Sequence, residues 1–174
     1  GKATVNIDAY EPYIKAVVQF TESSTDKDYQ DAIELFQKAI TADSNYALAY
    51  AGAAKAFAKL GRLQHINFKS DEEAVSNKTA VKYGQKAVKL DKNMGSAWVS
   101  LALIYRETKE RDKLVEAARR AIQIKPSQYD AYDILADAFT KKFFPENVNI
   151  DSAIANRKRA VDIEPKFAAG FRGL

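Results

Sequence analysis

One helical packing pattern occurs four times along the chain, and it constrains the fold more than any other feature of the sequence. Each copy has a large aromatic residue, small or aliphatic residues three and four positions later, and a second aromatic residue at the seventh position. These offsets place all four side chains on one helical face, where small central residues let a second helix approach closely. The copies are Tyr13/Ala16/Val17/Phe20, Tyr50/Ala53/Ala54/Phe57, Trp98/Leu101/Ala102/Tyr105 and Tyr132/Leu135/Ala136/Phe139.

A second pattern follows each of these packing helices. It is FQKAITADS, GQKAVKLDK, ARRAIQIKP and RKRAVDIEP in the four places. Similar segments indicate similar units, and Pro126 and Pro165 fall where a second helix of a unit should end. The whole chain has only 7 Gly and 4 Pro, which favours helices over a turn-rich β architecture. We therefore predict an all-α protein of antiparallel helix pairs.

The length of one unit points to a family. Trp98 and Tyr132 are 34 residues apart, and the pattern resembles the tetratricopeptide repeat consensus Trp-x2-Leu-Gly-x2-Tyr, Ala-x3-Phe and a closing Pro. The resemblance covers Tyr10 to Leu174, and the segments AYEPYIKA and YALAYAG are also similar to repeats found beside bacterial regulators and kinases. It implies one right-handed superhelical solenoid domain over 1–174. The expected units are 10–45, 46–93, 94–127 and 128–166, and residues 167–174 would begin a truncated fifth unit.

Two units are longer than the consensus, so we expect insertions. The first aromatic residue of one unit and that of the next are 48 residues apart from Tyr50 to Trp98 and 39 residues apart from Tyr132 to Phe171. Both insertions are predicted in the turn between the two helices of a unit, at 61–70 and 143–150, because closure entropy grows slowly with loop length. Ser70 and Glu73 predict a capping box at the start of the following helix, and Asp151 is expected to cap the last complete second helix.

No residue pattern indicates catalysis. Cysteine is absent, and the single His65 falls in the expected loop at 61–70, where we interpret it as an ordinary exposed residue and not as a metal ligand. The glycine-rich phosphate loops and the nucleophile elbow are missing from the sequence as well. We therefore predict that the chain is not an enzyme, has no catalytic residues, and holds no metal or cofactor.

The compartment is weakly constrained. No stretch approaches 18 consecutive apolar residues, so we expect a soluble chain without a transmembrane segment. The absence of cysteine fits a bacterial cytoplasm and a periplasm equally. The chain begins with Gly1 and ends without a polar capping helix, so we expect either a truncated end or self-association through the C-terminal end.

The resemblance also implies a binding surface. In the family, the first helix of each unit lines a concave groove that receives a segment of another protein. This predicts a protein or peptide partner, and an apolar first part of the groove at Ile14 and Val18. The family's clamp for chaperone tails needs Asn where this chain has Val18 and Gly52 or Ser100, which disfavours such tails. The predicted groove residues are Lys55, Lys59, Val99, Leu103, Arg106, Asp130, Asp133 and Asp137.

Three of these residues form an acidic stripe at spacings of three and four, namely Asp130, Asp133 and Asp137. One hypothesis is a solvated face that is partly neutralised by Arg106 or Lys141, and the other is contact with a basic partner segment. Because Asn keeps the shape of Asp and removes the repulsion, replacing all three by Asn is expected to leave folding unchanged or slightly improved.

The alternative function is electrostatic binding of nucleic acid or of an anionic membrane surface. Basic stretches occur on the second helices, which the resemblance places on the outer wall. The net charge of +4 and the pI near 9.1 reflect a small and dispersed excess. Aromatic residues do not interleave with these charges in the manner of a stacking platform, and Trp98 is interpreted as inter-helix core, so we expect nucleic acid to be the less favoured partner. The stretches are Arg119-Arg120, Arg157-Lys158-Arg159 and Lys82, Lys86 and Lys89.

Overall fold

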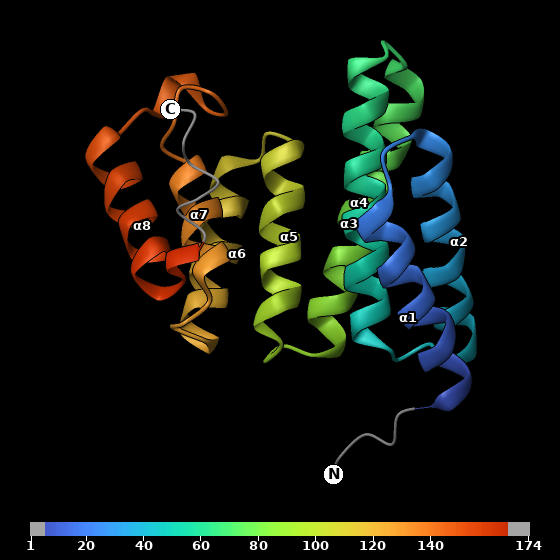
Figure 1. The fold of residues 1–174 in the computed structure, drawn as a ribbon. Helices are drawn as coiled ribbons and strands as arrows, with labels where there is room; N and C mark the ends of the chain where they lie inside the picture. The colour runs from blue at the N-terminus through green and yellow to red at the C-terminus, as the bar shows by residue number, and fades with distance from the viewer. Residues whose placement is uncertain (1–5, 167–174) are drawn as a thin grey trace. The chain divides into compact units, whose positions relative to one another are not determined.

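The computed structural model describes residues 6–166, and every regular element in this range is helical (Figure 1). The prediction of an all-α chain of antiparallel helix pairs is confirmed. The expected start of a fifth unit at 167–174 lies outside the described residues, and so does its proposed role in self-association. The helices are α1 (Ile7–Glu22), α2 (Asp26–Ala42), α3 (Ala47–Ile66), α4 (Ser70–Leu90), α5 (Gly95–Glu107), α6 (Arg111–Ile124), α7 (Tyr129–Asp137), the 3-10 helix η1 (Pro145–Asn147) and α8 (Ile150–Ile163).

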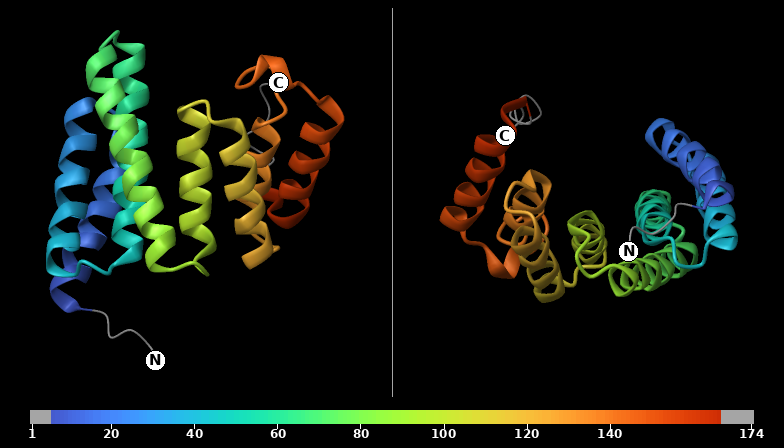
Figure 2. Two further views of the ribbon diagram at one scale, coloured as in Figure 1. Left: turned by 180° about the vertical axis from the view of Figure 1, so that it is seen from behind. Right: turned by 90° about the horizontal axis from the view of Figure 1, so that it is seen from below.

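The chain forms two compact units, 1–92 and 93–174, and each contains two helix pairs (Figure 2). In the first unit, α1 pairs with α2 and α3 pairs with α4, and α2 packs against α3. In the second unit, α5 pairs with α6 and α7 pairs with α8, and α7 contacts both α5 and α6. The bounds of the predicted repeats stay predictions. A single domain over the whole chain stays a prediction.

The packing pattern of the sequence provides the core of both units. Its central small or aliphatic residues are buried in all four copies except for Val17, which is partly exposed. The core of the first unit surrounds Phe36, which is 1% exposed, and a Cβ atom added to Gly52 would overlap its ring. Only glycine allows α3 to approach α2 this closely at that position.

The insertion in the second repeat lengthens both helices of the pair. Helices α3 and α4 have 20 and 21 residues, whereas α5 and α6 have 13 and 14. The loop predicted at 61–70 is therefore wrong, because α3 continues to Ile66 and buries Gly61 and Gln64 against α4. Each added helical residue gains a backbone hydrogen bond, which a long loop would leave to water. The pair projects beyond the α1–α2 pair within the first unit (Figure 1).

His65 is consequently helical and not a loop residue. It lies in the last turn of α3, and its Nδ1 is 3.0 Å from Glu73 Oε2. The imidazole stays mostly exposed to solvent, as predicted, with 73% of its side-chain surface accessible. The contact joins the ends of α3 and α4, so His65 has a structural partner within the turn.

Two predicted helix caps are wrong. Helix α4 begins at Ser70 itself, with Lys69 at the N-cap position and no side-chain cap, so the Ser70–Glu73 box does not form. The acidic side chains of its first turn still favour the helix through its dipole. The cap of α8 is Asn149, whose Oδ1 accepts a hydrogen bond of 2.9 Å from Ser152 N, and not Asp151.

The insertion in the fourth repeat is a loop, as predicted, but it begins earlier. Helix α7 ends at Asp137, so Phe139 of the fourth packing pattern lies beyond it. Arg111 Nε donates a hydrogen bond of 3.0 Å to Ala138 O, and Asn149 N donates one of 3.0 Å to Phe139 O. The first contact ties the start of the loop to α6, the second joins its two ends, and Phe144 is buried.

Within residues 6–166, no helix combines the length and apolar character that crossing a membrane requires.

Candidate functional site

A buried charge cluster connects α5, α7 and α8 in the second unit. We use the name charge cluster for Arg106, Glu107, Asp133, Asp137 and Arg157. Arg106 Nη1 donates to Asp137 Oδ2 over 2.7 Å, and Arg157 Nη2 donates to Asp137 Oδ1 over 2.6 Å. Arg106 also donates to Glu107 Oε1 from Nε over 3.1 Å and from Nη2 over 2.8 Å. Charge-assisted hydrogen bonds of this length are the stronger kind in proteins.

The centre of the cluster is shielded from water. The side chain of Asp137 is 4% exposed, that of Arg106 is 12% exposed and that of Arg157 is 25% exposed. Burial alone would lower the pKa of Arg106, but the hydrogen bonds and charges of Asp137 and Glu107 outweigh it and raise the pKa. The ring of Phe143, from the inserted loop, lies 4.9 Å from the Arg106 guanidinium carbon and adds a cation–π contact.

Asp133 is the member of the charge cluster whose carboxylate is not fully hydrogen-bonded. Its Oδ1 atom is buried and has no hydrogen-bond donor among the described residues, because Arg157 Nη1 is 3.9 Å away. Burial raises the pKa of the Asp133 carboxyl, the nearby Asp137 raises it further, and the two arginines only partly offset these effects. A donor supplied from outside would therefore stabilise the ionised form of this side chain.

The acidic stripe is thus not a uniformly solvated face. The prediction that Arg106 neutralises part of the stripe is confirmed for Asp137. The prediction that the stripe is solvated is wrong for Asp137, because its side chain is buried. Asp130 and Asp133 are partly exposed, and Asp130 accepts a hydrogen bond of 2.7 Å from Gln128 Nε2. The acidic stripe therefore consists of one buried residue, Asp137, and two partly exposed residues, Asp130 and Asp133, that a partner could reach.

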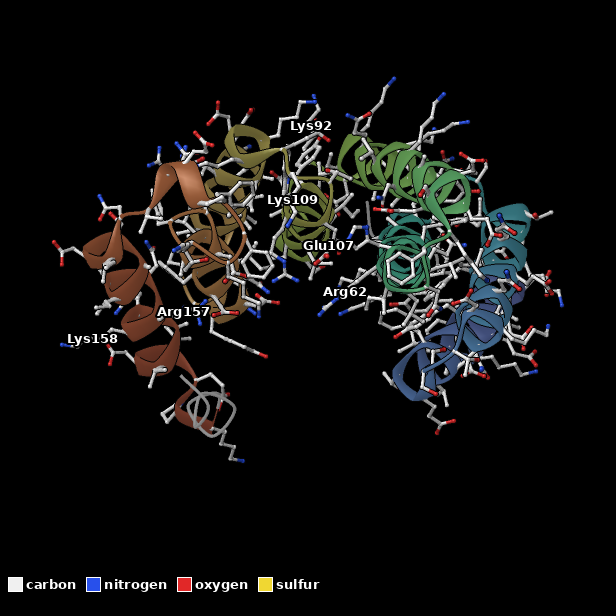
Figure 3. The ribbon with its side chains drawn as sticks, turned by 90° about the horizontal axis from the view of Figure 1, so that it is seen from above. Arg62, Lys92, Glu107, Lys109, Arg157 and Lys158 are labelled. Atoms are coloured by element: carbon white, nitrogen blue, oxygen red, sulfur yellow. The ribbon has the colours of Figure 1, made fainter. Side chains whose placement is uncertain are left out.

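Arg157 is the member of the charge cluster that the sequence reasoning missed. It was expected on the outer wall with Lys158 and Arg159, but it points toward α7 while Lys158 points away from it (Figure 3). The signal was present in the spacing, since Arg157 lies on the same helical face as the buried Ala153 and Ala160. The basic stretch on α8 is consequently weaker than its sequence suggests.

The other predicted groove residues differ in their exposure. Lys55 and Lys59 of α3 are partly exposed, and so is Leu103 of α5. Val99 is buried, with 4% of its surface exposed. The structure therefore joins Arg106 directly to Asp137 and places Asp133 3.9 Å from Arg157, whereas a binding role for the eight predicted residues as a set stays a prediction.

An apolar stripe runs along the exposed face of α1 in the first unit. It consists of Ile7, Tyr10, Ile14 and Val18, which are 80%, 47%, 40% and 52% exposed. Their spacings of three, four and four residues place them on one side of the helix. The sequence analysis singled out two of them but not Ile7 and Tyr10. We call this set the α1 stripe.

Trp98 lies at the edge of the second unit's core. It is partly exposed and lines a hollow of ≈ 630 Å³ together with side chains of α6. The predicted packing role fits its position against α6, but its burial is incomplete. Arg119 and Arg120 in this hollow face Asp112 and Glu116, so the formal charges cancel and do not favour a polyanion.

The part of the chain that the structure describes contains no group of three metal-ligating side chains. The polar residues of the charge cluster are held by one another, which suits recognition of a charged group and gives no nucleophile with an adjacent base.

The comparisons with known proteins agree with the repeat pattern. A family model described as "Tetratricopeptide repeat" matches residues 95–128, which span α5, α6 and the turn after them. The comparison with curated proteins gives no match.

Several solved structures share the fold. A crystal structure of MamA is 26% identical over 93% of this chain and 81% of that chain, with a TM-score of 0.61. The tetratricopeptide domain of OM64 from Arabidopsis is 16% identical over 78% of this chain and 97% of that chain, with a TM-score of 0.61. The first such domain of Spaghetti (RPAP3), bound to an HSP90 peptide, is 16% identical over 79% of this chain and 95% of that chain, with a TM-score of 0.60.

Proposed function

The chain is a tetratricopeptide repeat protein, and on this basis we propose that it is an interaction module that binds a segment of a partner protein and catalyses no reaction itself. In each unit by itself, a partner segment contacts the exposed faces of the first helices of the repeats. These are α1 and α3 in one unit and α5 and α7 in the other. The observation that carries this proposal is the α1 stripe.

The α1 stripe supports a protein partner because four neighbouring apolar side chains face solvent on one helix. Single exposed apolar residues are ordinary on a soluble surface, but a contiguous row of them marks an interaction site. The adjacent polar positions on α1 include Glu11 and Lys15, which pair with each other at 2.6 Å. That pair provides no net charge, so the stripe selects mainly by apolar contact.

The second unit contributes a different chemistry. Asp130 and Asp133 are partly exposed, and Asp133 has a buried oxygen without a donor. A basic side chain of the partner would pair with the accessible part of these carboxylates. The domain of Spaghetti (RPAP3) binds an HSP90 peptide. The family resemblance implies Asn at clamp positions where this chain has Val18 and Gly52 or Ser100. We therefore propose an apolar partner segment for the first unit and a basic partner segment for the second, and not a chaperone tail.

A pull-down with paired variants tests the proposal. The bait with Ile14→Asp and Val18→Asp introduces two charges into the α1 stripe at exposed positions, so the fold should be retained. Ile154→Asp on α8 is the control, because Ile154 is 60% exposed but lies outside the stripe. We expect a partner that both the wild-type protein and the control retain, and that the double variant loses. A partner that all three baits retain equally would contradict a role for the stripe.

Salt titration separates this proposal from binding to nucleic acid or an anionic membrane. Polyanion binding weakens steeply with salt because counterions are released, whereas an apolar contact weakens little. The basic stretches are also partly engaged within the protein, since Arg157 binds Asp137 and Lys86 Nζ lies 5.9 Å from the centre of the Tyr50 ring. A steep loss of binding between about 50 and 200 mM salt would favour the polyanion.

A further inference from the structure

A groove lies over α3, between α2 and α4, in the first unit. It is distinct from the α1 stripe and has a volume of ≈ 680 Å³, within the range of roughly 300–1,000 Å³ that is typical of ligand sites. One wall is a face of α2 from Gln30 to Gln37, the other is the first two turns of α4, and the floor is α3. The α4 wall belongs to the part of the helix pair that the insertion lengthens.

Two contacts between the walls define the ends of this groove. At one end, Lys69 Nζ is 2.8 Å from Asp26 Oδ2, which joins the start of α4 to the start of α2. At the other end, Gln37 Nε2 donates a hydrogen bond of 3.5 Å to Tyr83 Oη. Since a helix rises about 1.5 Å per residue, the stretch of α2 between Gln30 and Gln37 is about 10 Å long. The groove therefore has room for a short segment of a few side chains.

The floor of the groove is apolar and fixed. Ile33 and Leu60 are each 5% exposed, and Phe57 lies beside them. Gln64, which is 4% exposed, accepts a hydrogen bond of 2.7 Å from Ser76 Oγ and donates one of 3.4 Å to Glu72 Oε2. Its amide is therefore satisfied without a ligand, and the floor offers an apolar surface for an aliphatic side chain.

The rim of the groove is acidic. Glu34, Asp71 and Glu72 are exposed around it, and no Lys or Arg is among the described residues that line it. Lys69 offsets part of this charge, since its Nζ is 3.7 Å from Glu72 Oε2. A concave site with one sign of charge on its rim attracts ligands of the opposite charge.

We propose that this groove binds a second partner segment, one that places an aliphatic side chain on the floor and an Arg or Lys side chain against the acidic rim. The two features together determine which segment binds. An aliphatic side chain buries apolar surface on the floor, and the acidic rim favours a basic residue. The walls of the site lie on the second helices α2 and α4, and its floor is the face of α3 between them. It is therefore distinct from the α1 stripe, which lies on another helix.

A labelled hexapeptide, Leu-Arg-Leu-Leu-Arg-Leu, is a direct probe of the groove by fluorescence anisotropy. The test variant combines Glu34→Lys with Val75→Lys, since Glu34 is exposed and Val75, on the α4 wall, is 66% exposed. We expect its dissociation constant to rise at least about tenfold, equivalent to about 1.4 kcal/mol. The control combines Val148→Lys with Glu146→Lys in the second unit, where Val148 is 45% exposed and Glu146 is exposed; it changes the same types of residue by the same net charge and should stay within about twofold.

Two further arms make the test specific. A peptide with Ser in place of each Leu should bind at least about tenfold more weakly, because it cannot use the floor. Amide shifts of the wild-type protein with the leucine peptide should concentrate in 30–37 and 71–76, which reports the site without any variant. The inference is overturned if wild type does not bind the leucine peptide, if the serine peptide binds equally well, if both double variants lose affinity alike, or if the shifts lie in other helices.

Discussion

Asp137 is the residue whose replacement tests the charge cluster most directly. In Asp137→Asn the shape is kept, but two arginines lose the carboxylate that they share at 2.7 and 2.6 Å. Breaking a buried ion pair by removing one partner costs about 3–5 kcal/mol, and one hydrogen bond to a charged group contributes about 1.5–3 kcal/mol. Arg106 keeps Glu107, and Arg157 is 25% exposed and can turn toward water, so part of the loss is recovered. We expect destabilisation of about 2–4 kcal/mol.

The fluorescence of Trp98, the only tryptophan of the chain, reports unfolding of the second unit in urea. With a denaturant slope of about 2 kcal/mol per molar, the midpoint should fall by about 1–2 M. Asp130→Asn is the matched control on the same helix, because Asp130 is partly exposed and accepts a hydrogen bond from Gln128 outside the charge cluster. It should change the stability by no more than about 0.5 kcal/mol.

This result also decides the expectation for the acidic stripe. The sequence alone predicted that replacing Asp130, Asp133 and Asp137 together by Asn would leave folding unchanged. The position of Asp137 between two arginines reverses that expectation, and the triple variant should be nearly as unstable as Asp137→Asn. Equal urea midpoints for Asp137→Asn and Asp130→Asn would refute the reasoning and would return the stripe to a solvated face.

Three other changes test the core and the titration of the cluster. Leu135→Ala removes a buried side chain of the fourth packing pattern and should lower the free energy of unfolding by about 2–4 kcal/mol. The exposed Lys82→Ala should lower it by no more than about 0.5 kcal/mol, and equal melting shifts for the two variants would contradict the repeat register. Gly52→Ala should destabilise the first unit by about 1–3 kcal/mol because the new methyl group meets a buried ring, whereas Gly61→Ala meets the flexible end of an asparagine and should be nearly neutral by thermal melting. Burial raises the pKa of Asp133 above its ordinary value of 3.8, so ionisation of this carboxyl lowers the stability of the fold as pH rises through the folded-state pKa. Asp133→Asn should therefore be more stable than wild type at about pH 7. This advantage should disappear at about pH 3, where the carboxyl is protonated in both the folded and the unfolded state. A pH-independent difference in urea midpoint would show that the Asp133 carboxyl is not responsible.

The helices could be predicted from sequence because their core positions repeat at helical spacing. The pattern around Leu135 and Ala136 needs only local periodicity, and so do its three other copies. The lengths of α3 and α4 could not be inferred from repeat length alone, since an insertion can extend a helix or a loop. Residues 62–70 contain neither Gly nor Pro, and this was the available signal that the helices continue.

The binding surfaces were predictable only in part. The partnership of Arg106 with the acidic stripe followed from the family's groove positions, whereas that of Arg157 depends on how α8 packs against α7. The α1 stripe shows the same limit. Its residues follow an amphipathic pattern that would normally indicate a buried face, and only the packing of the first unit shows that Ile7 and Tyr10 face solvent.

The two units therefore offer a partner different kinds of contact energy. In the second unit, Asp137 and the two arginines are already fixed by one another, so a basic group that reaches Asp133 orders few additional side chains. Such preorganisation lowers the entropic cost of binding and makes the contact sensitive to geometry. On the α1 stripe, burial of apolar surface gives affinity with little directional preference. A partner that used only the stripe would bind with low selectivity, and one that used only Asp133 would bind weakly in salt. The second unit thus offers selectivity for a basic group through Asp133, and the first unit offers affinity through apolar burial on the α1 stripe.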